Sequence, residues 1–355
     1  LRTAMTSITF HGAAETVTGS KYLLQADNAK VLIDCGMFQG AKKLRQLNWE
    51  PLPFNHTEVD AVVLTHAHID HSGYLPRFVK GGYKGPIYAT GATSRLCELL
   101  LMDAAKNQER DAEHANRRGY TKHKPALPLY DHDDARDALK KFQNRDRGEW
   151  HEAKDPIWFR FHDAGHLLGS NLIEVEIRNR EPALRIVFSG DVGRYDGPLY
   201  HDPDPPPPCD VLVCESTYGD RDHPDIDLLQ SLAEVVRRSI ARGGVIVMSS
   251  FAVGRAQQLI YLLQVLMHEQ RIPQFPIYLD SPMSVDATNI YRDFRADHDL
   301  SEGDLANPTS VLDGPRLTLT RSVDASKELN DVRGPAVIIS SSGMMVGGRI
   351  LHHLK

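Results

Sequence analysis

The sequence lacks long hydrophobic runs and has few cysteines, and both absences limit what the protein can be. None of the 355 residues lies in an uninterrupted apolar run of about eighteen residues, the length that a membrane-spanning helix needs. The four cysteines show no C-x-x-C spacing, and each stands in or beside an apolar stretch. We therefore expect buried, reduced thiols in a cytoplasmic protein that does not associate with a membrane.

An excess of positive charge is also missing. The formal net charge is −6, which argues against a basic coat of the kind that holds nucleic acid over a whole surface. A local basic channel remains compatible with this charge, because affinity for phosphate depends on where the charged side chains lie. The length allows one large domain or two ordinary ones.

Histidine, by contrast, is abundant, with 17 residues in the chain. Several gather in T-H-A-H-I-D-H-S-G (Thr65–Gly73), directly after the apolar run Val59–Thr65, which predicts a strand covered on both faces. Imidazoles and a carboxylate are costly at the end of a buried strand unless something satisfies them. A run of surface histidines is the alternative, and the buried strand argues against it. The candidate metal ligands in this segment are His66, His68, Asp70 and His71.

Three further positions fit the same site. His166 lies shortly after the predicted strand Ile157–His162, Asp191 follows the strand Leu184–Phe188, and Asp34 closes an earlier strand. Each stands beside or near a glycine, where the backbone can approach a metal closely. Taken alone, a histidine after a strand is more often a hydrogen-bonded surface residue, so the combination carries the argument.

The order of these motifs resembles that of the metallo-β-lactamase superfamily. The resemblance implies an α/β fold, the αββα sandwich, with two zinc ions. His66, His68 and His166 would hold one zinc, and Asp70 and His71 would hold the second. Asp191 would bridge the two ions, and Asp34 would support the site without contacting a metal. Such donors suit zinc. Two ions roughly 3.5–4 Å apart would lower the pKa of a shared water to about 7 and supply a hydroxide nucleophile. Asp70 and Asp34 are therefore candidate catalytic residues.

The second half of the chain alternates predicted strands and helices from Asp227 onward, which is typical of a parallel sheet. Four of its segments are similar to the β-CASP branch of the superfamily, whose members cut nucleic acid: C-E-S-T-Y-G-D-R, S-S-F-A-V-G-R-A-Q, Y-L-D-S-P-M and S-S-S-G-M-M-V-G-G-R-I-L-H-H-L-K. The resemblance covers nearly the whole chain. It implies the N-terminal part of a metallo-β-lactamase domain over residues 8–215, an inserted α/β β-CASP domain over residues 216–355, and Glu215 as a further catalytic residue.

Two of these segments have the chemistry of phosphate binding. The connection Phe251–Arg255 leads through Gly254 into a predicted helix, so helix-start amides and a guanidinium come together. The glycine-rich segment Ser340–Arg349 offers hydroxyls, backbone donors and a second guanidinium. Ordinary turn chemistry and helix packing are the alternative for each segment. The candidate phosphate- or RNA-binding residues are Arg255, Ser341, Ser342, Gly343 and Arg349.

Two β-CASP motifs do not occur in the sequence. One is an S-x-H-A-type motif whose histidine Glu215 would orient, and the other is a late V-H-G-type motif that would complete the second zinc site. The residues are either part of a longer enzyme or a naturally shortened protein. We favour the first account, because an unfinished sandwich would be poorly stable. On either account the second zinc site is expected to be incomplete and nuclease activity weak.

The resulting expectation is a zinc-dependent RNA nuclease, cutting internally or from an end, that acts on single-stranded RNA and is compatible with a homodimer. A small-molecule ester or lactone hydrolase is the second hypothesis, because the fold hosts many substrates. The β-CASP-like segments argue against it, since such enzymes need no second α/β region. An inactive RNA-binding scaffold is the third, and the intact metal motifs argue against that.

Overall fold

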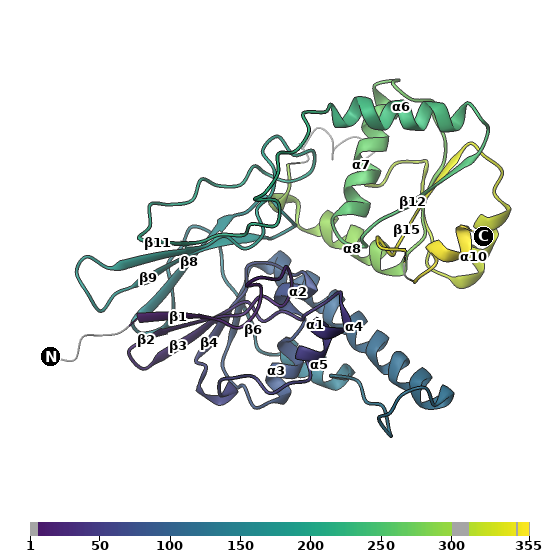
Figure 1. Ribbon diagram of the computed structural model, residues 1–355. Helices are drawn as coiled ribbons and strands as arrows, with labels where there is room; N and C mark the ends of the chain where they lie inside the picture. Colours follow the sequence, from purple (N-terminus) through teal and green to yellow (C-terminus); the bar gives the residue numbers. More distant parts are fainter. Residues whose placement is uncertain (1–5, 300–311, 346, 355) are drawn as a thin grey trace. The chain divides into compact units, whose positions relative to one another are not determined.

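The computed structural model describes residues 6–299, 312–345 and 347–354. The chain forms two compact units, the first from Leu1–Tyr195 and Asp202–Thr217, the second from Asp196–His201 and Tyr218–Lys355 (Figure 1). None of the helices in the described part of the chain combines the length and the apolarity that crossing a bilayer requires.

Two β-sheets form the centre of the first unit. One has the strand order β1-β2-β3-β4-β5-β6, antiparallel from β1 to β3 and parallel from β3 to β6. The other has the order β11-β10-β9-β8-β7 and is antiparallel except where β10 pairs with β11. The bounds are β1 Thr6–Phe10, β2 Tyr22–Ala26, β3 Ala29–Ile33, β4 Ala61–Val63, β5 Ile87–Ala89, β6 Phe142–Asn144, β7 His151–Lys154, β8 Ile157–Asp163, β9 Asn171–Ile177, β10 Leu184–Phe188 and β11 Val211–Val213.

The two sheets share one hydrophobic core. In β8, Ile157, Phe159 and Phe161 alternate with more polar residues and are fully buried, as expected for a strand with one face on a core. They belong to one cluster of buried side chains with Val31 and Val63 of the opposite sheet. The expected sandwich of two facing sheets is therefore present, and the apolar runs at β3 and β4 are buried as predicted.

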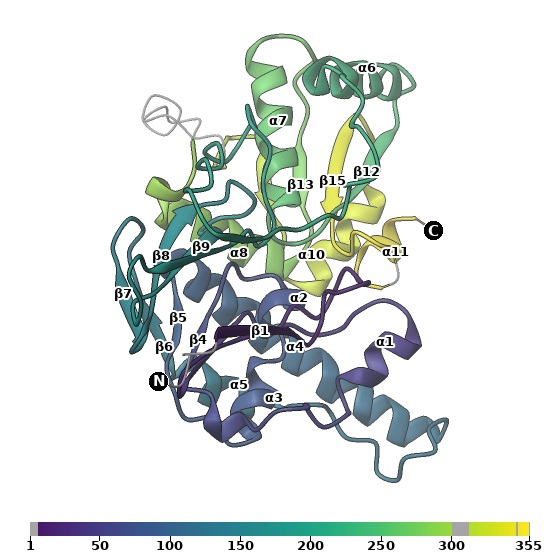
Figure 2. The ribbon, with the colours of Figure 1, turned by 60° about the vertical axis from the view of Figure 1, so that its left-hand side comes forward.

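Helices α2, α3, α4 and α5 pack with one another beside the first sheet (Figures 1 and 2). The helices of this unit are α1 Lys42–Leu47, α2 Ile69–Ser72, α3 Leu75–Lys80, α4 Gly91–Arg118 and α5 His132–Leu139, with a 3-10 turn at His56–Glu58. The sequence predicts a helix over Thr93–Asn107 and then a solvated loop or helical cap over Gln108–Asp134. That boundary is wrong, because α4 continues to Arg118 through residues that favour helix and ends only where Gly119 takes a φ of +66°.

The second unit contains a parallel sheet, as the alternation of strands and helices predicts. Its strand order is β12-β15-β13-β14, and every pair is parallel (Figure 2). The bounds are β12 Val245–Ser249, β13 Ile277–Leu279, β14 Leu317–Leu319, β15 Ala336–Ser340, α6 Leu228–Ile240, α7 Arg255–His268, α8 Pro282–Asp293, α10 Val323–Glu328 and α11 Ile350–His353, with 3-10 turns at Arg295–Asp297 and Leu329–Asp331.

The cysteines follow the expectation only in part. Cys35 and Cys97 are buried and Cys209 is half-buried, but Cys214 is exposed. The apolar run before Cys214 predicts burial, and that expectation is wrong because β11 is the edge strand of its sheet. All four thiols are free.

Replacing Phe161 by alanine should lower the free energy of unfolding of the first unit by about 3–5 kcal/mol, because the phenyl ring is fully buried between the sheets. Urea unfolding followed by circular dichroism measures the change. Phe10→Ala is the matched control, since that ring is 48% exposed and its loss should change the free energy by less than about 1 kcal/mol. Equal losses in the two variants would contradict a core at Phe161.

Candidate metal centre

Strand β4 and helix α2 place the histidine cluster. The chain leaves β4 at Val63 with Thr65 and His66 fully or almost fully buried, and His68 then caps the start of α2. The first turn of α2 carries Asp70 and its last turn His71, so a single short segment presents three imidazoles and a carboxylate. The prediction that these residues stand at the end of a buried strand is confirmed.

Three imidazole nitrogens and one carboxylate converge. His68 Nδ1 lies 3.0 Å from His66 Nε2 and 3.2 Å from His166 Nε2. Asp191 Oδ2 lies 3.8 Å from His66 Nε2 and 3.5 Å from His166 Nε2. One ligand atom from each of these four residues lies within 4.8 Å of all the others. The loops after β4, β8 and β10, far apart in the sequence, therefore meet at one point.

The spacing and the charge state of these groups fit a bound cation. Nitrogen ligands 2.0–2.1 Å from a tetrahedral zinc lie roughly 3.3 Å from one another, close to the separations found here. Burial lowers the pKa of His66, and burial together with His166 lowers the pKa of His68 to about 3. Burial also lowers the pKa of His166. The three rings are therefore neutral near pH 7 and have lone pairs available for a metal.

Of the predicted metal ligands, Asp70 and His71 do not belong to this converging group of four. His71 Nε2 lies 3.2 Å from Asp191 Oδ1, the carboxylate oxygen that does not face His66 and His166. Burial by itself would lower the pKa of His71, but the carboxylates of Asp34 and Asp191 outweigh it and hold that pKa well above its usual value. Asp70 is mostly buried, which raises its pKa, and it lies near enough to His71 and Asp191 to sense their charge. The two oxygens of Asp191 therefore face different imidazoles, and a bridging role between two ions stays a prediction.

Asp34 and Thr65 hold the rings in place. Asp34 is fully buried at a φ of +57°, and its carboxylate accepts hydrogen bonds from the Thr65 amide at 2.8 Å, the Thr65 hydroxyl at 2.8 Å and His71 Nδ1 at 2.7 Å. The Thr65 hydroxyl also lies 3.0 Å from His66 Nδ1. A carboxylate behind a ligating imidazole fixes its tautomer and orientation. Thr65 is not among the residues that the sequence patterns predict for the site, although its position directly before His66 is a signal for it.

Two glycines allow the backbone to close around the centre. A Cβ on Gly36 would lie 1.6 Å from the carbonyl oxygen of Asp70, so only glycine fits between the strand ends there. Gly190 has a φ of +52°, and a Cβ would lie 2.7 Å from the Thr65 Cβ. These two glycines therefore allow close approach between protein segments, while a close approach of the backbone to a metal stays a prediction.

Glu215 is fixed beside the centre. Its Oε1 accepts a hydrogen bond from the Val192 amide at 3.0 Å, and its own amide donates to Ser189 Oγ at 3.0 Å. The strand end that carries Glu215 is thus fastened to the loop that carries Asp191. These contacts place the carboxylate but do not test its catalytic role, which stays a prediction.

The phosphate-binding candidates lie at the carboxyl ends of the parallel strands in the second unit. Ser341 Oγ lies 2.9 Å from Ser281 Oγ. Gly343 approaches Phe251 so closely that a Cβ would lie 3.1 Å from the Phe251 nitrogen. Ser342 accepts a hydrogen bond from the Met345 amide in the same loop. The glycine-rich loop after β15 therefore adjoins the connection into α7, which carries the exposed Arg255.

Arg349 makes its contacts inside the second unit. Its Nη1 lies 2.7 Å from the fully buried carboxylate of Asp280, and its Nη2 donates to the Arg321 carbonyl at 2.7 Å. His353 Nε2 contacts the same carboxylate at 2.7 Å. The arrangement agrees with the alternative of helix packing weighed for this segment. A contact between Arg349 and RNA remains an untested prediction.

Replacing Asp34 by asparagine should weaken metal binding by roughly 10- to 100-fold, because the negative charge behind His71 is lost. Asparagine tolerates positive φ and its amide oxygen can still accept from the Thr65 amide, so the loop is retained. Competition with a chromogenic chelator measures the affinity. The matched control is Asp60→Asn, a half-buried carboxylate of the same unit that accepts from the Lys30 amide. Unchanged affinity in Asp34→Asn, or an equal loss in both variants, would contradict the role assigned to Asp34.

Comparisons with known proteins agree with this geometry. The family model for the metallo-beta-lactamase superfamily matches residues 16–231, and the Beta-Casp domain model matches residues 256–355. The chain is 38% identical to a ribonuclease of Thermus thermophilus over 97% of this chain and 74% of the relative. It is 31% identical to transcription termination factor FttA of Methanosarcina mazei over 98% of this chain, and spans only 53% of that factor.

A solved structure shares the fold. A protein of unknown function from Enterococcus faecalis V583 matches with a TM-score of 0.50 at 13% identity, over 95% of this chain and 77% of that one. At such low identity the match concerns the fold alone. The two family models and the identity to the Thermus ribonuclease lead to one conclusion: this chain belongs to the metallo-β-lactamase superfamily and to its β-CASP family.

Proposed function

We propose that the protein is a zinc-dependent ribonuclease that hydrolyses phosphodiester bonds of single-stranded RNA. One observation carries the proposal. Three neutral imidazole nitrogens and the Asp191 carboxylate converge within 4.8 Å, in a chain that is 38% identical to a protein named ribonuclease. Membership of the superfamily implies that this centre binds divalent metal. The choice of zinc, the number of ions and the RNA substrate are parts of the proposal.

The donor set supports zinc. His66, His68 and His166 offer only nitrogen, and Asp191 adds one oxygen, a combination that suits zinc better than magnesium or calcium, which prefer oxygen. A second ion would be held by His71, Asp70 and the other oxygen of Asp191. A pair of bound ions supplies an activated water and neutralises charge on the phosphate.

The residues of the chain prepare this chemistry by position. Asp34 and Thr65 orient His71 and His66, so ligand geometry need not be reorganised when a substrate arrives. Glu215, held by the Val192 amide, is the candidate group for managing a proton on the leaving oxygen. In the second unit, the loops before α7 and after β15 present hydroxyls and amides that suit RNA phosphates.

The two other hypotheses are weaker. A small-molecule ester or lactone hydrolase would need no Beta-Casp domain, and that domain is present over residues 256–355. An inactive scaffold would have no use for three imidazoles and a carboxylate whose ligand atoms converge within 4.8 Å. A cytoplasmic location and a homodimer stay predictions. Gel filtration with light scattering tests the second of these.

Single-stranded RNA labelled at either end should be cleaved by the zinc-loaded protein and spared after treatment with a chelator, and added zinc should restore cleavage. Asp70→Ala and Asp191→Asn should each lower the rate by roughly 100-fold or more, because the loss of a ligand removes several kcal/mol of charge stabilisation. Asp133→Ala is the control, since that carboxylate is 87% exposed and only pairs with Arg136. The metal content of the purified protein, measured by mass spectrometry, identifies the ion.

The same preparations separate the alternatives. Cleavage that is equal in wild type, Asp70→Ala and Asp191→Asn would show that the assigned centre is wrong. Hydrolysis of a chromogenic ester with intact RNA would favour the small-molecule hydrolase. Binding of RNA without cleavage under any metal would favour the scaffold.

A further inference from the structure

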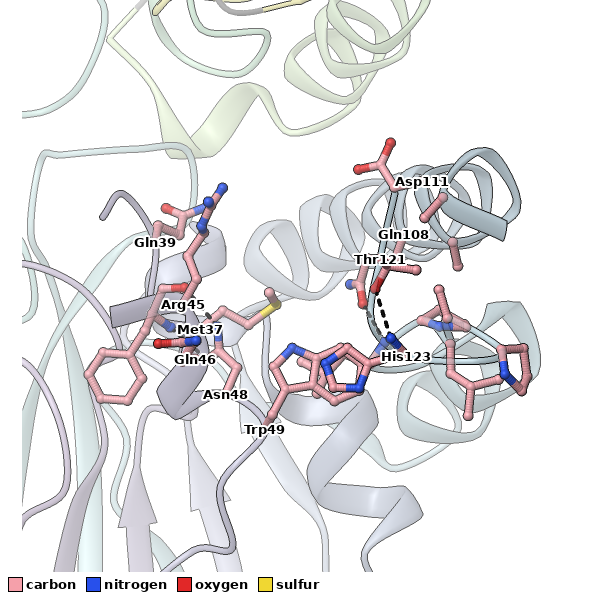
Figure 3. A pocket seen from close by; sticks show the side chains of 18 of the residues that line it. Met37, Gln39, Arg45, Gln46, Asn48, Trp49, Gln108, Asp111, Thr121 and His123 are labelled. Carbon is pink, nitrogen blue, oxygen red and sulfur yellow. Dashed lines mark hydrogen bonds between the residues drawn. The ribbon is translucent and has the colours of Figure 1, made fainter. Parts of the chain in front are cut away.

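A large pocket opens in the first unit, formed by residues other than the metal ligands. It has a volume of about 810 Å³. One wall is the segment from Met37 to Trp49, which includes α1, and the other is the second half of α4 with the loop that follows it to Leu129 (Figure 3). The Trp49 indole and the His123 imidazole extend into the space between these walls (Figure 3). Neither the motifs of the sequence nor the metal centre accounts for this pocket.

Both walls are fastened by hydrogen bonds, so the pocket is preformed. On the first wall, the Asn48 side chain accepts from the Phe38 amide at 2.9 Å and donates to the Phe38 carbonyl at 2.8 Å. On the second wall, the Asn116 side chain accepts from the Ala126 amide at 2.7 Å and donates to the Ala126 carbonyl at 2.9 Å. A concave, largely apolar site held open in this way is typical of ligand pockets.

Trp49 is an exposed aromatic side chain in the lining of the pocket. Its side chain is 55% exposed, although it is among the largest apolar groups of the chain. The other tryptophans, Trp150 and Trp158, are covered by the guanidinium groups of Arg160 and Arg178. Within the residues that the structure describes, no ring or guanidinium covers Trp49 in this way. An exposed indole in a preformed pocket is a platform for a flat ring.

The pocket lining carries one guanidinium, Arg45, and one carboxylate, Asp111, in a chain of net charge −6. Helix α1 carries three cations, Lys42, Lys43 and Arg45, and the residues directly after it include one acid, Glu50. The end of α4 and the loop after it add four more cations. Of the resulting set, only Arg45 lines the pocket, the others belong to the same wall segments outside the lining, and none makes an ion pair within the described residues: Lys42, Lys43, Arg45, Arg117, Arg118, Lys122 and Lys124. A concentration of unpaired cations around an aromatic platform favours a polyanion that carries flat rings.

The pocket wall is also continuous with the metal centre. The Met37 amide donates to the Ile69 carbonyl at 2.9 Å, one residue before Asp70, and the neighbouring Gly36 packs directly on the Asp70 carbonyl. Both belong to the first unit, so their relation does not depend on how the two units are arranged. The pocket wall and the metal centre are therefore linked through backbone contacts between residues 36–37 and residues 69–70.

We propose that this pocket binds an unpaired nucleobase of RNA, stacked on Trp49, with the adjoining phosphate on Arg45. The inference rests on the proposed function in taking RNA as the ligand, and it adds a second RNA site to the metal centre. Single-stranded RNA is commonly held by stacking its bases on aromatic side chains beside basic groups. A partner protein is the competing occupant, but the seven unpaired cations favour phosphate over an apolar peptide.

Two measurements test the proposal. The first follows tryptophan fluorescence in the Asp70→Ala background while short oligoadenylate is added. The emission of exposed Trp49 should be quenched, and the signal should vanish in Trp49→Phe, which retains only the covered Trp150 and Trp158. An oligomer of the same length with abasic sugars should leave the emission almost unchanged, because it has phosphates but no ring to stack.

The second measurement is the dissociation constant for labelled oligoadenylate by anisotropy. Trp49→Ala should weaken binding by roughly 5- to 100-fold, which corresponds to the loss of one stacked base, and Trp49→Phe should retain most of the affinity. Arg45→Gln should weaken binding. It should also make the slope of log affinity against log salt concentration shallower by about one, the value expected for one lost phosphate contact. Arg180→Gln, an exposed arginine of the β9–β10 turn, is the matched control and should bind like the parent protein.

The possible results separate this proposal from the proposed function. If RNA binds equally well to the parent, Trp49→Ala and Arg45→Gln, the pocket does not hold a base, and a protein occupant becomes the better account. If oligoadenylate quenches Trp49 and the unaltered protein cleaves no RNA with any metal, the pocket stands and the nuclease proposal falls. Quenching by the abasic oligomer as strong as by oligoadenylate would overturn base stacking. Circular dichroism of each variant confirms that a loss of affinity does not come from unfolding.

Discussion

The metal centre depends on one buried carboxylate. Asp34 has no exposed surface, and its two oxygens accept hydrogen bonds from the Thr65 amide and hydroxyl and from His71. A buried carboxylate without partners would be destabilising, so this set of hydrogen bonds ties the end of β3 to the segment after β4. The same bonds fix the imidazole of His71 and, through the Thr65 hydroxyl, that of His66. Fold stability and ligand geometry are therefore two consequences of the same contacts.

The sandwich around this carboxylate explains why the ligands can come from distant parts of the sequence. Strands β4, β8 and β10 each end near the same point, and the loops that follow them carry His66 and His68, His166, and Asp191. The shared core, in which Phe159 and Phe161 belong to one cluster with Val63, holds the two sheets in a fixed position relative to each other. Because interiors are closely packed, a ligand at a strand end is positioned by the whole core behind it.

Burial also decides the charge of each ligand. The three rings nearest one another lose their protons because a buried cation is costly and each ring repels the next. The pKa of His71 is raised instead, because the carboxylates of Asp34 and Asp191 lie beside its ring. Similar side chains thus acquire different roles from their surroundings. The surroundings of Trp49 likewise decide its proposed role. Its ring is exposed in a pocket that also contains Arg45, which would suit an RNA base and phosphate although the chain has a negative net charge.

The sequence by itself determined the elements and the ligand candidates, because these depend on local patterns. The apolar run before Thr65 and the alternation in Ile157–His162 predicted strands that the structure confirms. The histidine motif marked His66 and His68, and the family resemblance added His166 and Asp191, which follow other strands. Only the tertiary structure decided which long-range contacts those residues make. The bond from the Thr65 hydroxyl to Asp34, the pairing of Arg349 with Asp280 and the pocket at Trp49 each join segments far apart in the chain. The exposure of Cys214 follows from the position of β11 at the edge of its sheet. Local patterns carry no record of such contacts, since the chain has to fold before the partners meet.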